Sequence, residues 1–131
     1  MDKATLQQLP SFITADGSSI RELAGPTSDG PGPTSESADS VHQSLAEATV
    51  LPGGETAEHY HPRSEEIYYF VAGRGRMRLG EEEAEVAAGD CVVIAPGTPH
   101  KLINDSSAES LVLLCCCAPP YAHADTVMTG G

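Results

Sequence analysis

The chain has few basic residues, no long apolar run and no sustained helical pattern, and each absence narrows the classes of protein to which it can belong. Seven lysines and arginines stand against 19 aspartates and glutamates, which gives a formal net charge of −12 at pH 7. This negative field repels phosphate backbones and anionic lipids, so nucleic acid and membranes are not expected partners. No stretch approaches the roughly 20 apolar residues that a membrane-spanning helix needs.

The first ten residues also lack an apolar run of signal-peptide length. We therefore expect a cytoplasmic protein. Its 131 residues are a usual size for one domain with one modest hydrophobic core.

The four cysteines lack the spacing of a disulfide framework. Cys115, Cys116 and Cys117 are consecutive within the apolar run 111–118. We expect reduced, buried thiols that behave as small hydrophobic side chains. On a strand, Cys115 and Cys117 would face one side and Cys116 the other, so either of the first two could instead line a pocket.

Short strand-like segments follow one another from residue 41 onward, separated by turns rich in glycine, proline and asparagine. No helical periodicity of useful length interrupts them. Evenly spaced short strands are typical of an all-β sandwich or barrel. The segments predicted as strands are 44–51, 67–72, 76–79, 84–87, 91–94, 101–103 and 111–117.

Two further stretches precede this region. A turn at residues 16–18 lies between apolar positions of the segment 11–23 and predicts an N-terminal strand or hairpin. Residues 25–40 are rich in glycine, proline and serine and contain almost no large apolar side chain. Burial there cannot offset the entropy of ordering, so we expect a flexible surface loop, with a lid over a pocket mouth as the alternative.

One hairpin has a register that can be predicted in detail. A two-residue turn at Gly80-Glu81 places opposite charges across from each other, which favours that register by a few tenths of a kcal/mol, roughly. The arginines then form a solvated face, with anion binding as the alternative, and Met77 faces inward. The predicted pairs are Leu79 with Glu82, Arg78 with Glu83, and Arg76 with Glu85.

Four potential ligands for a divalent metal ion occur at two places in the chain. His59 and His61 are two residues apart, so on a strand both imidazoles point to one side. Residues 62–64 interrupt that strand, and Glu66 can return a carboxylate from the next one. His100 follows a proline-glycine turn and arrives from a distant strand. Three imidazoles and one carboxylate suit a transition metal ion, provided that the sheet closes on itself.

Residues 53–73 and 89–104 resemble the two sequence motifs of the cupin superfamily. The first motif is matched by Gly53, His59, His61, Glu66 and Gly73, and the second by Gly89, Gly97, His100 and Asn104. The proline of the second motif is replaced by Ala95, with Pro96 directly after it, and this departure touches no ligand. The resemblance implies a single domain over residues 1–131, folded as a double-stranded β-helix or jelly-roll barrel.

The resemblance also implies a ligand set for one divalent transition metal ion, which could be Fe, Mn, Ni or Zn. The ligands would be His59, His61, Glu66 and His100. Glu65 competes for the carboxylate position, and the spacing to the last glycine of the first motif favours Glu66.

Side chains that alternate with the ligands should line a pocket around this ion. An aromatic and aliphatic lining suits a small, partly apolar molecule that carries oxygen. Gln43 and Glu47, on the strand before the first motif, could orient a histidine, and ordinary core packing is the alternative for the apolar residues. The residues predicted for this pocket are Tyr68, Phe70, Met77, Leu102 and Gln43.

We expect a metal-dependent enzyme that acts on a small oxygen-bearing organic molecule, with dioxygenase-type chemistry on an enol or acid as the leading hypothesis. Glu66 would act as a base and Tyr68 would donate a hydrogen bond. The alternatives are a metal-dependent isomerase, decarboxylase or cyclase, and a barrel that binds a small molecule without turnover. No helix-turn-helix segment supports a DNA-linked sensor.

The resemblance implies a homodimer as well. The prolines of the segment 118–121 cannot continue a central strand, because proline lacks the amide donor. This segment could therefore cross to a neighbouring barrel.

Overall fold

The computed structural model describes residues 1–26 and 36–131, and almost every regular element in it is a β-strand. The first half of the chain forms η1 (Leu6–Gln8), β1 (Phe12–Ile13), β2 (Ser19–Gly25), β3 (Ala38–Asp39), β4 (Ser44–Val50), β5 (His59–Tyr60) and β6 (Glu65–Ala72). The second half forms β7 (Arg74–Leu79), β8 (Glu82–Ala87), β9 (Cys91–Ile94), β10 (His100–Ile103), β11 (Leu111–Ala118), η2 (His123–Asp125) and β12 (Val127–Met128).

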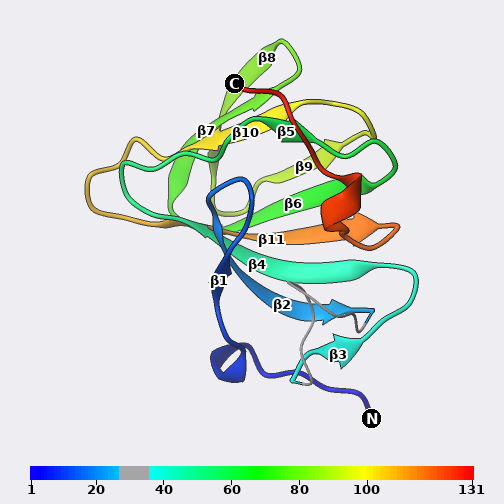
Figure 1. Ribbon diagram of the computed structural model, residues 1–131. Coiled ribbons are helices and arrows are strands. Elements are labelled where there is room, and N and C mark those ends of the chain that lie inside the picture. The colour runs from blue at the N-terminus through cyan, green and yellow to red at the C-terminus, as the bar shows by residue number, and fades with distance from the viewer. Residues whose placement is uncertain (27–35) are drawn as a thin grey trace.

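The strands form two sheets, which appear as a lower and an upper layer in Figure 1. A seven-stranded sheet has the order β1-β2-β4-β11-β6-β9, with β3 added in parallel beside β2. A five-stranded sheet has the order β12-β5-β10-β7-β8. The pairing is otherwise antiparallel, and the chain passes back and forth between the layers. This arrangement confirms the predicted all-β jelly roll.

Each of the seven segments predicted as strands overlaps an observed strand, and the N-terminal hairpin is present as β1 and β2. The β7–β8 register is also confirmed, with Arg78 opposite Glu83 and Arg76 opposite Glu85. The ion pair nevertheless runs diagonally, because Arg76 Nη2 lies 2.6 Å from Glu83 Oε1. Both side chains are exposed, so this arginine belongs to a solvated face.

The expected flexible loop at residues 25–40 needs correction at both ends. Gly25 is the last residue of β2, and Ala38 and Asp39 form β3, which pairs with Ala24 and Gly25. A backbone ladder can order polar residues that bury little surface, and composition alone does not reveal it. Residues 27–35 of the expected loop lie outside the described residues.

The hydrophobic core lies between the two sheets and is built by alternation along the strands. On β6, Tyr68 and Phe70 are buried, whereas Tyr69 between them is 45% exposed. From the facing sheet, Met77 and Leu102 pack into the same cluster. Side chains on a strand alternate between the two faces of the sheet, so each layer presents one apolar face to the other.

The structure explains why two positions of the cupin motifs are occupied by glycine and asparagine. Gly73 has a positive φ of 78°, and a Cβ there would collide with the backbone oxygen of Ser110. Asn104 is 1% exposed, and its amide nitrogen donates to the carbonyls of Val50 and Glu109 at 2.9 and 2.8 Å. These residues hold the loops at one end of the barrel, away from the histidines.

The C-terminal segment folds back over its own barrel. Strand β11 ends at Ala118, and the chain then turns through η2 into β12, which pairs with β5 in register Val127 with Tyr60 and Met128 with His59. Figure 1 shows this red segment lying across the open edge between the two layers. In the described part of the chain no helix has the length and apolar character needed to cross a membrane.

Candidate metal centre and its cavity

Three histidines meet between the sheets, and the strand register explains how. His59 begins β5 and His100 begins β10, and the two residues are paired directly across these neighbouring strands. His61 directly follows β5, and all three rings are buried. The distance between ring centroids is 4.4 Å for His59 and His100, and 5.1 Å for His59 and His61. His100 is thus next to His59 in the sheet, contrary to the expectation of a distant strand.

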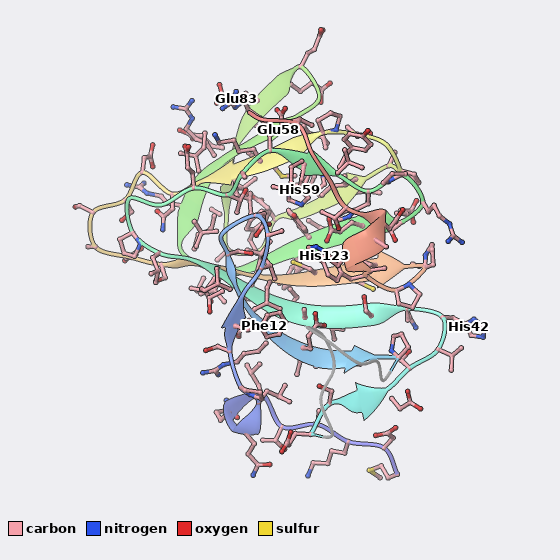
Figure 2. All side chains as sticks on the ribbon, viewed as in Figure 1. Phe12, His42, Glu58, His59, Glu83 and His123 are labelled. Atoms are coloured by element: carbon pink, nitrogen blue, oxygen red, sulfur yellow. The ribbon has the colours of Figure 1, made fainter. Side chains whose placement is uncertain are left out.

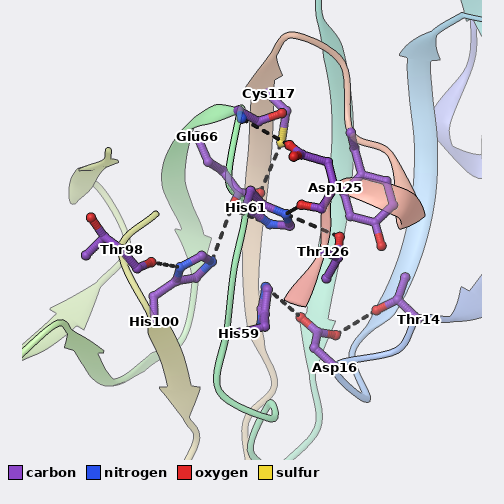
Figure 3. Close-up of polar contacts among 12 residues, drawn as sticks. Thr14, Asp16, His59, His61, Glu66, Thr98, His100, Cys117, Asp125 and Thr126 are labelled. Carbon is purple, nitrogen blue, oxygen red and sulfur yellow. Dashed lines mark hydrogen bonds and ion pairs between the residues drawn. The ribbon is translucent and has the colours of Figure 1, made fainter. Parts of the chain in front are cut away.

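Hydrogen bonds to the backbone orient the three imidazoles in the same sense. The Nδ1 atoms of His59, His61 and His100 lie 2.9, 3.0 and 2.9 Å from the carbonyl oxygens of Ala57, Asp125 and Thr98, respectively. Figure 3 shows the bonds of two of these rings. A carbonyl can only accept, so each Nδ1 carries the proton and each neutral ring keeps a lone pair on Nε2. A hydrogen bond from Nδ1 to a backbone carbonyl is the usual arrangement for histidines that bind a metal through Nε2.

Glu66 completes the cluster from the opposite sheet. Its Oε1 lies 3.3 Å from His100 Nε2 and 3.4 Å from His61 Nε2. Both Glu66 Oε1 and His100 Nε2 are buried without a hydrogen-bond partner. Two lone pairs that face each other in this way repel, unless a proton or a cation lies between them. Two ligand atoms about 2.1 Å from one ion are about 3.0–3.4 Å apart in octahedral or tetrahedral geometry, so these residues fit a divalent ion.

The structure also distinguishes the two neighbouring glutamates. Glu65 is exposed at the start of β6, whereas Glu66 is 5% exposed and points toward the histidines. Burial by itself would raise the pKa of Glu66, but His100 and His61 outweigh it and lower the pKa to about 2. The Cys117 thiol donates to Glu66 Oε2 at 3.2 Å, which fixes the second carboxylate oxygen. The carboxylate is therefore ionised and held in place.

The other two histidines lie apart from this cluster. His42 projects from the loop before β4 at the outside of the molecule in Figure 2, and His123 is exposed on η2. The only group of three potential metal-binding side chains among the described residues is His59, His61 and His100.

The C-terminal segment holds one wall of the site. The carbonyl of Asp125 accepts from His61 Nδ1, and its carboxylate accepts from the backbone amides of Arg63 and Ser64 at 3.1 Å each. Ser64 in turn donates from its hydroxyl to the carbonyl of Pro119 at 2.8 Å. The orientation of His61 thus depends on a segment more than sixty residues away in the sequence.

Replacing Asp125 with alanine is expected to weaken metal binding about tenfold, because the bonds that fix η2 against the loop after His61 are lost. Titration calorimetry with Zn²⁺ measures the change. His123→Ala changes an exposed residue of the same short helix and should leave the affinity as it is. Equal affinities for D125A and the parent protein would show that the segment does not orient His61.

A cavity opens beside the histidine cluster and holds about 50 Å³, enough for a few water molecules or one end of a small molecule. Of the residues predicted to line it, Tyr68 and Leu102 do so. Phe70 and Met77 lie behind them in the core and do not reach the cavity. Gln43 is exposed on the outside, where its side chain meets Cys116 at 3.9 Å, so it does not orient a histidine.

Two carboxylates in the cavity wall were not anticipated from the sequence. Asp16 lies in the turn between β1 and β2, and its Oδ2 is 3.8 Å from His59 Nε2. The Thr14 hydroxyl donates to the other carboxylate oxygen at 2.6 Å (Figure 3). The Ser18 hydroxyl donates to the same oxygen, also at 2.6 Å. Glu22 lines the cavity from β2. Residues two apart on a strand share a face, so the apolar Ile20 could have indicated that Glu22 also faces inward.

Comparison with known proteins agrees with this architecture. The Cupin_2 family, described as "Cupin domain", matches residues 46–117. The uncharacterized protein MJ1618 of Methanocaldococcus jannaschii is 45% identical over 124 residues, which cover 95% of this chain and 91% of that protein. Polyketide synthase CurC of Streptomyces cyaneus is 35% identical over 83 residues, 60% of this chain and 54% of CurC.

Among solved structures, Pac13 of Streptomyces, described as a nucleoside dehydratase, superposes with a TM-score of 0.73 at 18% identity. The match covers 99% of this chain and 92% of Pac13, and at this identity it supports the fold alone. The protein belongs to the cupin family: it is a small β-barrel protein in which three histidines cluster as a potential metal site.

Proposed function

We propose that the protein is a metal-dependent enzyme that moves protons on a small oxygen-bearing organic molecule, as an isomerase, dehydratase or cyclase does. The observation that carries this proposal is the placement of Asp16 and Glu22 in the same cavity wall as the proposed ligands His59, His61 and Glu66. Ionisable groups beyond the ligand set are what proton transfer requires. Dioxygenase chemistry, the leading hypothesis from the sequence, was expected to use only the ligand Glu66 as a base, so it does not account for these two groups.

His59, His61, Glu66 and His100 would hold one divalent ion. When bound, this ion would supply a Lewis acid that stabilises negative charge on a carbonyl or hydroxyl oxygen. Burial raises the pKa of Tyr68 well above its ordinary value, so its hydroxyl keeps the proton and can donate a hydrogen bond to such an oxygen. The largely apolar remainder of the wall excludes water and strengthens these contacts.

The relative CurC supports an oxygen-rich substrate. It is named as a polyketide synthase, and polyketides carry the carbonyl and enol oxygens that such a site binds. The small cavity suits one ring or one end of such a molecule.

Metal analysis of the purified protein, followed by a screen over enols, catechols and keto acids, tests the proposal. Substrate loss followed by NMR and oxygen uptake followed by electrode distinguish the two chemistries. We expect conversion or proton exchange without oxygen consumption. Oxygen uptake that matches substrate loss would assign the protein to the dioxygenases, and a protein that binds no divalent ion would contradict both.

We also propose that the protein forms a homodimer through the outer face of the seven-stranded sheet. Ile67, Tyr69 and Val71 on β6 and Val93 on β9 are 36–56% exposed and lie side by side in the β6–β9 register. An apolar patch of this kind on a soluble domain commonly marks a protein interface.

The four free cysteines fit a reducing, cytoplasmic compartment.

The variant Tyr69→Lys should weaken this dimer at least tenfold, because it places a charge in the centre of the patch. Sedimentation velocity over a range of micromolar concentrations measures the dissociation constant. Glu85→Lys, an exposed change on β8 of the other sheet, is the matched control. A parent protein that sediments as a monomer throughout this range would contradict the proposal.

A further inference from the structure

Glu22 is a buried acidic group that the metal centre does not use. It is 5% exposed on β2 and lines the cavity, yet its carboxylate makes no hydrogen bond or ion pair with any described residue. Its backbone carbonyl accepts a hydrogen bond from the Ser37 hydroxyl at 2.6 Å. A charged group buried without a partner is costly, so folds retain one where it has a role.

The sheet register shows what lies beside Glu22. Along one row of the seven-stranded sheet, Glu22 pairs with Ala46, Ala46 with Cys115, and Cys115 with Tyr68. All four side chains line the cavity. The two middle residues are small, so they leave a floor on which a molecule can lie, with an acid at one end and a phenol at the other.

The cavity that Glu22 lines also reaches the histidines. Three strand spacings of about 4.8 Å would separate Glu22 from Tyr68 by about 14 Å on a flat sheet. His59, His61 and Glu66 line the same cavity as Glu22, and Asp16, in the turn just before β2, reaches within 3.8 Å of His59 in the other layer. A small molecule in this cavity therefore has Glu22 on one side and the metal centre on the other.

No cation compensates the charge of Glu22. The cavity wall contains no lysine or arginine among the described residues. Burial accordingly raises the pKa of Glu22 from 4.5 to about 7. The titratable groups that face the same cavity are Asp16, His59, His61, Glu66, Tyr68, Cys115, Cys117 and Tyr121.

We infer that Glu22 is the acid–base residue of this site, and that it takes a proton from a cavity-bound molecule and returns it at another atom. This inference rests on the proposed function. The Glu22 carboxylate forms an O–H bond with a proton from the carbon next to a carbonyl group. The C–H bond breaks, its electron pair forms a C=C bond, and the electron pair of the C=O bond moves onto the carbonyl oxygen. In an α-hydroxy carbonyl compound the proton then returns from Glu22 to the former carbonyl carbon, while the proton of the neighbouring hydroxyl group moves to the former carbonyl oxygen. This restores the carboxylate and shifts the carbonyl group by one carbon, without an oxidant.

The two buried glutamates, Glu22 and Glu66, would have different roles in the site. Glu66 has a lowered pKa and stays ionised, as a ligand must, whereas Glu22 exchanges protons near neutral pH. Carboxyl groups whose environments push their pKa values apart in this way commonly carry different roles in one site.

Proton exchange tests the inference without knowledge of the natural substrate. The zinc-loaded protein is incubated in D₂O with hydroxyacetone or D-xylulose, and loss of the proton signals next to the carbonyl is followed by NMR. We expect the full-length protein to accelerate exchange, with a rate that rises with pH and levels off above about 7. Glu22→Gln should slow the exchange about 100-fold or more and remove this pH dependence, with zinc affinity unchanged.

Matched variants separate the outcomes. Glu47→Gln changes a half-buried glutamate on the outer face of the adjacent strand β4 and should exchange at the parent rate. Glu22→Asp keeps the carboxyl group but shortens the side chain by one methylene, so it should slow exchange about tenfold. This variant replaces Glu22→Gln in the test if the glutamine variant folds poorly.

Exchange by Glu22→Gln or Glu22→Asp at the parent rate would overturn the role of Glu22 and leave the proposed function standing. Absence of exchange by the zinc-loaded parent protein with either probe would overturn the proposed function, and the role of Glu22 with it.

Discussion

A protein with alanine in place of His100 is expected to lose tight binding of a divalent ion, with an affinity at least about 1,000-fold lower than that of the parent, or about 4 kcal/mol. His100 is 1% exposed, its ring lies 4.4 Å from that of His59, and its Nε2 is 3.3 Å from Glu66 Oε1. Replacing His100 with alanine removes the Nε2 atom that faces His59 and Glu66. Titration calorimetry with Zn²⁺ and elemental analysis of the dialysed protein measure the effect.

The same variant should lose the stabilisation that the ion gives to the fold. For the parent protein, an ion at 100 times its dissociation constant adds about 2.7 kcal/mol to the free energy of unfolding. The melting temperature of the parent should therefore rise when Zn²⁺ is added, and that of H100A should not. The exposed His42 provides the control, since H42A should respond to Zn²⁺ as the parent does. Unchanged zinc content in H100A would refute the three-histidine centre.

The sequence was sufficient for the strands and the histidine cluster because both follow from short-range rules. Two-residue alternation places Tyr68 and Phe70 on the inner face with Glu66, and Tyr69 on the outer face. The turn at Gly80 sets the β7–β8 register through opposite charges. Spacing alone therefore indicated which side chains converge.

The rest of the cavity depends on contacts that no local pattern records. In the sequence Asp16 has the character of a turn residue, and only the folding of the β1–β2 turn against the other layer brings it to His59. Asp125 reads as part of a polar tail, yet its carbonyl orients His61. The two-residue alternation correctly predicted that Phe70 faces inward. It could not show that Tyr68 lines the cavity and that Phe70 does not reach it. Long-range packing decides which inward residues form a wall and which form the core.

The ion-free protein should become more stable at high pH when Glu22 is replaced by glutamine. The pKa of Glu22 is raised from 4.5 to about 7, so the folded chain binds a proton that the unfolded chain releases between these values. This contribution to stability is fully present below pH 4.5 and is lost as the pH rises through about 7. A shift of this size corresponds to at most about 3 kcal/mol.

Glutamine keeps the shape of the side chain and carries no charge at any pH. We therefore expect E22Q and the parent to have similar free energies of unfolding at pH 5, and E22Q to be more stable by about 2 kcal/mol at pH 8. Urea unfolding of both proteins at the two pH values measures this difference, and comparison of the two cancels groups that titrate equally in both. The lowered pKa of Glu66 acts only below pH 4.5, where stability falls as the pH approaches 2, so it lies outside this window.

A difference between E22Q and the parent that stays constant from pH 5 to pH 8 would show that the carboxylate of Glu22 is solvated in the folded protein. A difference that grows with pH, together with the slower proton exchange expected of E22Q, would mean that one side chain lowers stability and supports turnover at once. That combination is expected where an acidic group is held in a closed cavity for catalysis, since the same lack of a partner that destabilises the charge also brings its pKa to neutrality.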